Sequence, residues 1–153
     1  MKLVDIIHPE RIRIDLMSGG KMDVLSELGN LLAAGSTIVS ADAVTQTLVD
    51  RERLATTGVG GGVAIPHGKL EGLKNILAAV GISRTGISFD AVDNAPVHIF
   101  VALVAPLNSS GDHLRALARI SRLLKDPSIR QRLIEARFPE DVYGIISQED
   151  GER

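Results

Sequence analysis

The chain contains no cysteine and no tryptophan among its 153 residues. The lack of cysteine excludes disulfides, thiol catalysis and cysteine-ligated metal sites, and it agrees with a reducing compartment. Aromatic residues make up only 3% of the chain, too few for the stacking platforms that bind single-stranded nucleic acids. The net charge of −2 at pH 7 provides no broad basic field, so we expect no nucleic-acid partner.

Long hydrophobic runs are also missing. The longest one, "IFVALVAP" at 99–106, is far shorter than the roughly 20 residues that cross a bilayer. The first 15 residues have no apolar core of the kind found in a signal peptide. We therefore expect a cytoplasmic protein with no membrane insertion. With 44% hydrophobic and 24% charged residues, residues 1–153 are expected to form one globular domain.

The first half of the chain predicts a strand followed by two helices. Residues 11–16, "RIRIDL", alternate between charged and apolar side chains, which is typical of a half-buried strand. An apolar stripe at helical spacing over 22–35 ends at Gly35, a favourable residue after a helix C-terminus. Ser40 then suits the N-cap of a helix over 41–54.

The second half predicts the centre of a sheet and then helices. Residues 63–65 fit a short strand, and the apolar runs 75–83 and 96–106 fit central strands covered on both faces, with a short strand and a turn between them. A helix is expected from Ser110 or Asp112, and Pro127 and Pro139 suit the first positions of two more helices. Strands flanked by helices on both sides in the sequence indicate a three-layer α/β/α sandwich.

A glycine-rich stretch, "TTGVGGGVAIPHGK" at 56–69, raises the question of nucleotide binding. A Walker loop requires a glycine where Val63 stands and a serine or threonine where Leu70 stands. The dinucleotide fingerprint Gly-x-Gly-x-x-Gly, counted from Gly58, also ends on Val63. Both templates fail, so we expect no nucleotide cofactor. The plainer interpretation of the glycines is a connection between a helix and a strand.

His67 closes this stretch between Pro66 and Gly68. Proline restricts the local backbone and glycine leaves the imidazole approachable. An imidazole is largely neutral near pH 7 and can act as a nucleophile, base or ligand. A single histidine is more often structural than functional, so His67 becomes a candidate only together with other residues.

Helical geometry adds two further candidate residues, Arg51 and His113. At about 100° per residue, Arg51 lies about 20° from Val44 and continues the apolar stripe of its helix, whereas Arg53 points the opposite way. His113 similarly lies within about 40° of the apolar residues 117, 120 and 124 on the following helix. The plainer interpretations are an arginine covering the edge of the core and a capping or packing histidine.

Other candidate sites are weaker. His8 fits a solvent-facing "HPE" turn and His98 fits packing in a strand. Asp90 and Asp93 are better explained by turn chemistry than by a catalytic pair. No two histidines have the spacing of metal ligands, so no metal is expected. The arginines of the 111–125 helix suit a solvated face or an acidic partner.

The segment "ERLATTGVGGGVAIPHG" at 52–68 resembles the active-site signature of type-2 IIA proteins, the mannitol/fructose class of the bacterial phosphotransferase system. The constrained positions are all met, by Glu52, Val59, Gly60, Val63, Ala64, Ile65, Pro66, His67 and Gly68. Similarity continues through "HGKLEGLKN" and "HLRALARISRLL", and "FDAVDNAPV" looks most like the nitrogen-regulatory branch. The resemblance implies a mixed sheet of about five strands between helical layers.

The resemblance also implies a phosphohistidine relay. His67 would accept a phosphoryl group on Nε2 from an HPr-like carrier, and Arg51 and His113 would stabilise that group. The glycines would leave clearance for the carrier, and their N–H groups would add dipoles. Without cysteine the chain cannot supply the later IIB step, which favours a regulatory phosphotransferase component with its own target protein. Two other functions remain open: a sugar-transport IIA that serves a separate IIB, and a binding module that is not phosphorylated.

Overall fold

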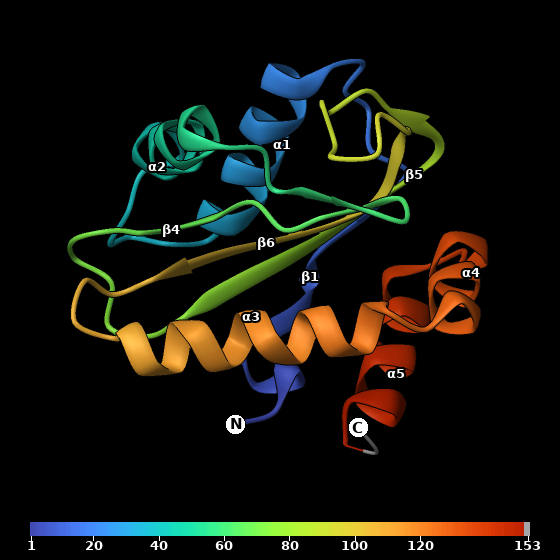
Figure 1. Cartoon of the computed structure of the whole chain (residues 1–153). Coiled ribbons are helices and arrows are strands. Elements are labelled where there is room, and N and C mark those ends of the chain that lie inside the picture. Colours follow the sequence, from blue (N-terminus) through green and yellow to red (C-terminus); the bar gives the residue numbers. More distant parts are fainter. Residues whose placement is uncertain (152–153) are drawn as a thin grey trace.

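The computed structural model describes residues 1–151 and has α/β architecture. Helices cover both faces of a six-stranded mixed sheet (Figure 1). The strands are β1 (Ile7–Ile14), β2 (Gly58–Gly60), β3 (Val63–Ala64), β4 (His67–Lys69), β5 (Leu77–Ile87) and β6 (Val97–Ala105). Their order is β1-β5-β6-β3-β2, and β4 also pairs with β6. The predicted fold class is confirmed, with six strands where about five were expected.

The helices form two layers on the sheet. They are α1 (Lys21–Ala33), α2 (Ala41–Leu54), α3 (Ser110–Leu124), α4 (Pro127–Glu135) and α5 (Pro139–Asp150), preceded by the 3-10 turn η1 (Leu3–Asp5). Figure 1 shows α1 and α2 on one side of the sheet and α3 and α5 on the other, with α4 beside the end of α3. Within residues 1–151, no helix has both the length and the apolar character needed to cross a bilayer.

The sheet separates two apolar cores, which explains why its central strand is apolar throughout. On β6, the side chains of Ile99, Val101 and Leu103 pack with α3, α4 and α5. The alternating side chains Phe100, Ala102 and Val104 pack with α1 and α2. Because successive side chains of a strand point to opposite faces, a strand buried on both faces needs an unbroken apolar run.

Most of the predicted elements are confirmed, with shifted ends. The side chain of Ser40 accepts a hydrogen bond from the N–H of Ala43, as expected of an N-cap. Pro127 and Pro139 begin α4 and α5. The N-cap of α3 is Ser109 rather than Ser110 or Asp112, and its side chain makes no capping bond. The short strand expected before the turn at Asp93 is the end of the long strand β5.

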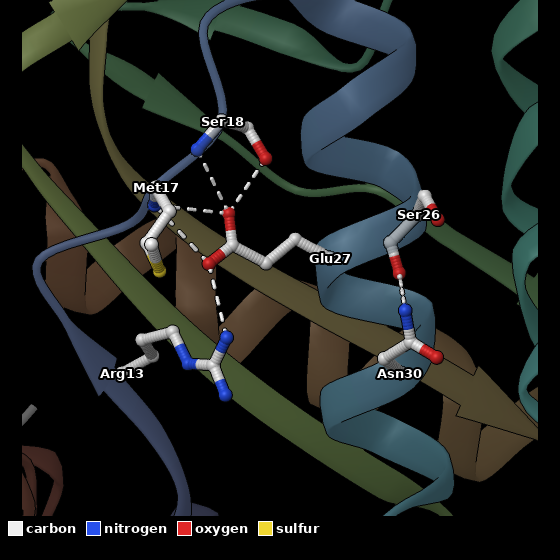
Figure 2. Close-up of polar contacts among 6 residues, drawn as sticks. All are labelled: Arg13, Met17, Ser18, Ser26, Glu27 and Asn30. Atoms are coloured by element: carbon white, nitrogen blue, oxygen red, sulfur yellow. Dashed lines mark hydrogen bonds and ion pairs between the residues drawn. The ribbon is translucent and has the colours of Figure 1, made fainter.

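The connection from β1 to α1 is tied to its helix by Glu27 (Figure 2). Its carboxylate accepts hydrogen bonds from the N–H groups of Met17 and Ser18, from the Ser18 hydroxyl and from Arg13. Burial would raise the pKa of Glu27, but these hydrogen bonds outweigh it and lower the pKa below its ordinary value. The carboxylate therefore stays charged and ties the middle of α1 to Arg13 of β1 and to the residues that follow this strand.

Candidate active site

The three residues selected from the sequence meet in one cavity of about 490 Å³. His67 comes from β4, Arg51 from the last turn of α2 and His113 from the first turn of α3. The cavity is completed by Gly68, Lys69 and three residues of α2: Thr47, Asp50 and Leu54. Sequence reasoning did not select Lys69, which lies two residues after His67 in β4, or these α2 residues, which only the packing of α2 on β4 brings to the site.

Backbone pairing and one glycine set the position of His67. β4 runs parallel to β6 with His67 opposite Leu103, and the Leu103 N–H donates to the carbonyl of Pro66 at 2.9 Å. A Cβ on Gly68 would lie 2.6 Å from Cγ2 of Thr47. Glycine at this position therefore permits the close approach of α2 that places Arg51 beside His67.

The hydrogen bond of His67 determines which ring nitrogen is free. Nδ1 lies 2.7 Å from the carbonyl oxygen of Ile65. A carbonyl oxygen can only accept, so Nδ1 carries the proton and Nε2 carries the lone pair. Burial has the largest effect on the pKa of His67 and lowers it. The Ile65 hydrogen bond opposes this effect, and the charges of Arg51, which lowers the pKa, and of Glu52, which raises it, contribute less. At pH 7 the ring is neutral and Nε2 is available as a nucleophile.

His113 lies edge-on to His67, with the ring centroids 5.5 Å apart. It is 7% exposed. Burial, followed by the charges of His67 and Lys69, lowers the pKa of His113 to about 4. Its Nε2 is buried and has no hydrogen-bond partner within residues 1–151. A buried polar atom without a partner is costly, so this nitrogen is poised to bond with a group that enters the cavity.

Arg51 keeps most of its hydrogen-bonding capacity. It is half-buried, and its Nη1 donates to the carbonyl of Ala55 at 2.9 Å. No carboxylate of the described chain lies within ion-pair distance of Arg51, whereas exposed Arg53 pairs with Asp50 at 3.7 Å. Lys69 supplies a second cation and donates to the hydroxyl of Ser110 at the start of α3. The cavity therefore combines a neutral nucleophile with cations that attract an anion.

Glu52 is a positioning residue that sequence reasoning noted only as part of the motif. It is buried next to Arg51 and accepts hydrogen bonds from the N–H and the hydroxyl of Thr57. Lys21 of α1 neutralises it at 3.0 Å. These contacts fasten the end of α2 to the start of β2. The sequence around Glu52 does not show that its carboxylate is buried, because its partners Lys21 and Thr57 come from two other segments of the chain.

The glycines have a different role from the one expected. Gly60, Gly61 and Gly62 have φ values of 95°, 67° and 80° and form the tight turn between β2 and β3. Positive φ is accessible to glycine without steric cost. Gly61 donates its N–H to Asp93, and Gly60 lines another cavity, with Arg130. The expectation of clearance and free N–H dipoles for the His67 site is therefore wrong for this turn.

The remaining histidines and aspartates lie outside the site. Nδ1 of His98 is 2.9 Å from the carbonyl of Ser83, which agrees with a packing role. His8 is exposed but lies in strand β1 rather than in a turn. Asp93 accepts hydrogen bonds from Gly61 and Ala95, as turn chemistry predicted.

Comparison with known proteins agrees with this geometry. Residues 5–149 match the family described as "Phosphoenolpyruvate-dependent sugar phosphotransferase system, EIIA 2". The chain belongs to this family of phosphotransferase components. It is 40% identical over 147 residues to a nitrogen regulatory protein of Bradyrhizobium diazoefficiens, covering 96% of this chain and 95% of the relative.

Two further comparisons define its neighbours in the EIIA type-2 family. The crystal structure of nitrogen regulatory protein IIA-Ntr from Neisseria meningitidis superposes with a TM-score of 0.88 at 35% identity, covering 94% of this chain and 98% of that one. A fructose-specific EIIABC component of Bacillus subtilis is 31% identical over 150 residues, covering 98% of this chain but only 24% of that longer protein. The predicted resemblance, including its nitrogen-regulatory branch, is confirmed.

The buried neutral state of His113 predicts how stability depends on pH. Its pKa is about 4 in the folded chain and about 6.5 in an unfolded one, so the unfolded chain binds the proton more readily. The contribution of neutral His113 to the unfolding free energy is therefore complete above pH 6.5, and it is lost as pH falls toward 4. Between pH 7.5 and 5, wild type should lose up to about 2 kcal/mol more unfolding free energy than His113→Asn. Urea unfolding at both pH values measures this difference.

The control for this comparison is His8→Asn, which removes an exposed histidine. It should keep the pH dependence of wild type. If His113→Asn lost as much stability as wild type on acidification, the neutral buried state assigned to His113 would be contradicted.

Proposed function

We propose that Nε2 of His67 accepts a phosphoryl group from an HPr-like carrier, and that the chain acts as a regulatory phosphocarrier. One observation carries this proposal: the hydrogen bond from Nδ1 to Ile65 leaves Nε2 unprotonated in a cavity that also holds Arg51 and His113. Family membership supplies the reaction class. The proposal includes a cytoplasmic location, where such a carrier acts.

The proposed transfer is an in-line displacement. The Nε2 lone pair forms the new nitrogen–phosphorus bond, while the bond from phosphorus to the leaving atom of the carrier breaks and its electron pair stays on the carrier. Arg51 binds the phosphoryl oxygens through its guanidinium. His113 donates an Nε2–H to the same group, which provides the partner that this buried nitrogen lacks within residues 1–151. The Ile65 carbonyl stabilises the positive charge that develops on the His67 ring.

Two observations support the regulatory role: the charge that a phosphoryl group adds to the cavity, and the similarity to nitrogen regulatory proteins. By analogy with other phosphorylated side chains, the group adds about −1.5 to −2 charge. It would appear in a cavity bordered by the exposed side chain of Leu54, so a partner that contacts this border can distinguish the two states. The similarity to nitrogen regulatory proteins over nearly the whole chain favours this role. The fructose-specific relative keeps a second candidate open, transfer to a separate IIB.

Phosphoryl transfer tests the proposal. The wild-type chain, incubated with enzyme I, HPr and labelled phosphoenolpyruvate, should acquire an acid-labile phosphate. A wild-type chain that stays unlabelled would instead indicate a binding module that is not phosphorylated. Adding a fructose-type IIB separates the two remaining roles: a regulator should keep its label, whereas a sugar-transport IIA should pass it to the IIB cysteine.

Partner capture tests the regulatory role. Phosphorylated wild type and the charge-mimicking His67→Asp should retain one set of proteins from the lysate of the source cells, and His67→Ala should retain another. Identical sets would contradict a switch controlled by phosphorylation.

A further inference from the structure

A separate cavity of about 270 Å³ lies where α1 ends and β5 begins. Its wall includes Arg11 of β1 and residues of two connections, one between α1 and α2 and the other between β4 and β5. It shares no lining residue with the His67 cavity. Nothing in the proposed phosphoryl transfer uses these residues.

Arg11 is the unusual group in this cavity. Only 9% of it is exposed. Its Nε donates to the carbonyl of Ala78 at 3.2 Å and its Nη2 donates to the carbonyl of Ile6 at 3.3 Å. These bonds occupy the side edge of the guanidinium. Its end edge, formed by Nη1 and the second N–H of Nη2, has no partner among residues 1–151.

The charge of Arg11 is also not neutralised. Within residues 1–151, no carboxylate lies within 4.0 Å of Arg11, and its neighbour Glu10 acts on it only at longer range. Burial lowers the pKa of Arg11, but a guanidinium remains charged in proteins. A buried cation is costly without a counter-charge. The free edge is the geometry that binds a carboxylate or phosphate through two parallel hydrogen bonds.

The rest of the wall suits the same kind of ligand. Lys74 adds an exposed cation that has no ion-pair partner within residues 1–151, and Asn75 adds an amide. The hydroxyl of Ser36 accepts from the N–H groups of Ile38 and Val39, so its own proton is free to be donated. The side chains of Leu32 and Ile38 line the cavity with apolar surface.

We propose that this cavity binds a small organic oxyanion, a carboxylate or phosphate attached to a compact apolar group. The oxyanion pairs with the free edge of Arg11 and with Lys74, and the apolar group lies against Leu32 and Ile38. The volume suits a small metabolite rather than a nucleotide or a peptide.

The test is a titration of the full ¹⁵N-labelled chain, followed by its amide and arginine Nε–H signals at constant chloride. Butyrate and butyl phosphate are the two anionic probes, and butyramide is the uncharged control. Saturable shifts are expected at Gly35, Ser36, Lys74 and Asn75 and at Nε–H of Arg11 with at least one anion. The tighter-binding probe identifies the oxyanion. No phosphoryl donor is present, so the outcome does not depend on the function of His67.

Two exposed lysines provide matched variants. Lys74→Ala should weaken binding of the preferred anion at least fivefold. Lys125→Ala removes the same charge at a different cavity and should leave the affinity within twofold of wild type. The proposal is overturned if neither anion gives saturable shifts, if butyramide binds as well as the anions, or if both variants weaken binding equally.

Discussion

His67→Ala is expected to abolish labelling by phosphoenolpyruvate, enzyme I and HPr. The substitution removes Nε2, the unprotonated ring nitrogen in the cavity. The other histidines do not replace it. Nδ1 of His98 faces the carbonyl of Ser83, and His113 is buried with a pKa of about 4. The measurement is the acid-labile phosphate retained per chain, relative to wild type.

His8→Ala is the matched control, because it removes an exposed histidine far along the chain from the motif. It should accept as much phosphate as wild type. A His67→Ala chain that is labelled as fully as wild type would show that the acceptor lies elsewhere, and the assignment of His67 would be wrong.

Arg51→Ala is expected to slow phosphoryl transfer by about 10²- to 10³-fold, the usual loss when one preorganised donor to developing charge is removed. Arg51 has no carboxylate partner in the described chain and lines the cavity beside His67. The single-turnover rate of transfer from phosphorylated HPr measures the effect. Arg51→Lys should recover only part of the rate, because an ammonium lacks the two-pronged geometry of a guanidinium.

Arg53→Ala is the control on the same helix. This residue is exposed and contacts Asp50 at 3.7 Å, so its loss should change the rate by less than threefold, as expected for a weak surface pair. Because Arg51 also bonds to the carbonyl of Ala55, the melting temperatures of both variants should be compared. Equal rates for Arg51→Ala and Arg53→Ala would remove Arg51 from the site.

Helical periodicity predicted that two of the three candidate residues face the core. Arg51 and His113 lie on apolar stripes, and a polar residue on such a stripe lies at the edge of the core; His113 is buried there and Arg51 is half-buried. The structure shows both at one cavity, because α2 ends and α3 begins beside β4. The strands β5 and β6 were equally predictable, because burial on both faces requires unbroken apolar runs.

Tertiary contacts explain what the sequence did not reveal. Glu52 is recognisable as a positioning residue only once Lys21 and Thr57 lie beside it. The role of Gly68 depends on the close approach of Thr47. The role of Gly60–Gly62 also depends on tertiary contacts. A cluster of glycines indicates positive φ or close approach, and only the pairing of β2 with β3 shows that a turn is the reason at Gly60–Gly62.

In the proposed transfer, the phosphoryl group attaches to Nε2 of His67 while Nδ1 keeps its proton. Long-range ¹H–¹⁵N correlation spectra of the chain carrying ¹⁵N-labelled histidine, recorded before and after phosphorylation, test it most directly. We expect phosphorus coupling at Nε2 of His67 alone, with Nδ1 still protonated and bonded to the Ile65 carbonyl. Coupling at Nδ1 of His67, or at any nitrogen of another histidine, would show that Nε2 of His67 is not the acceptor.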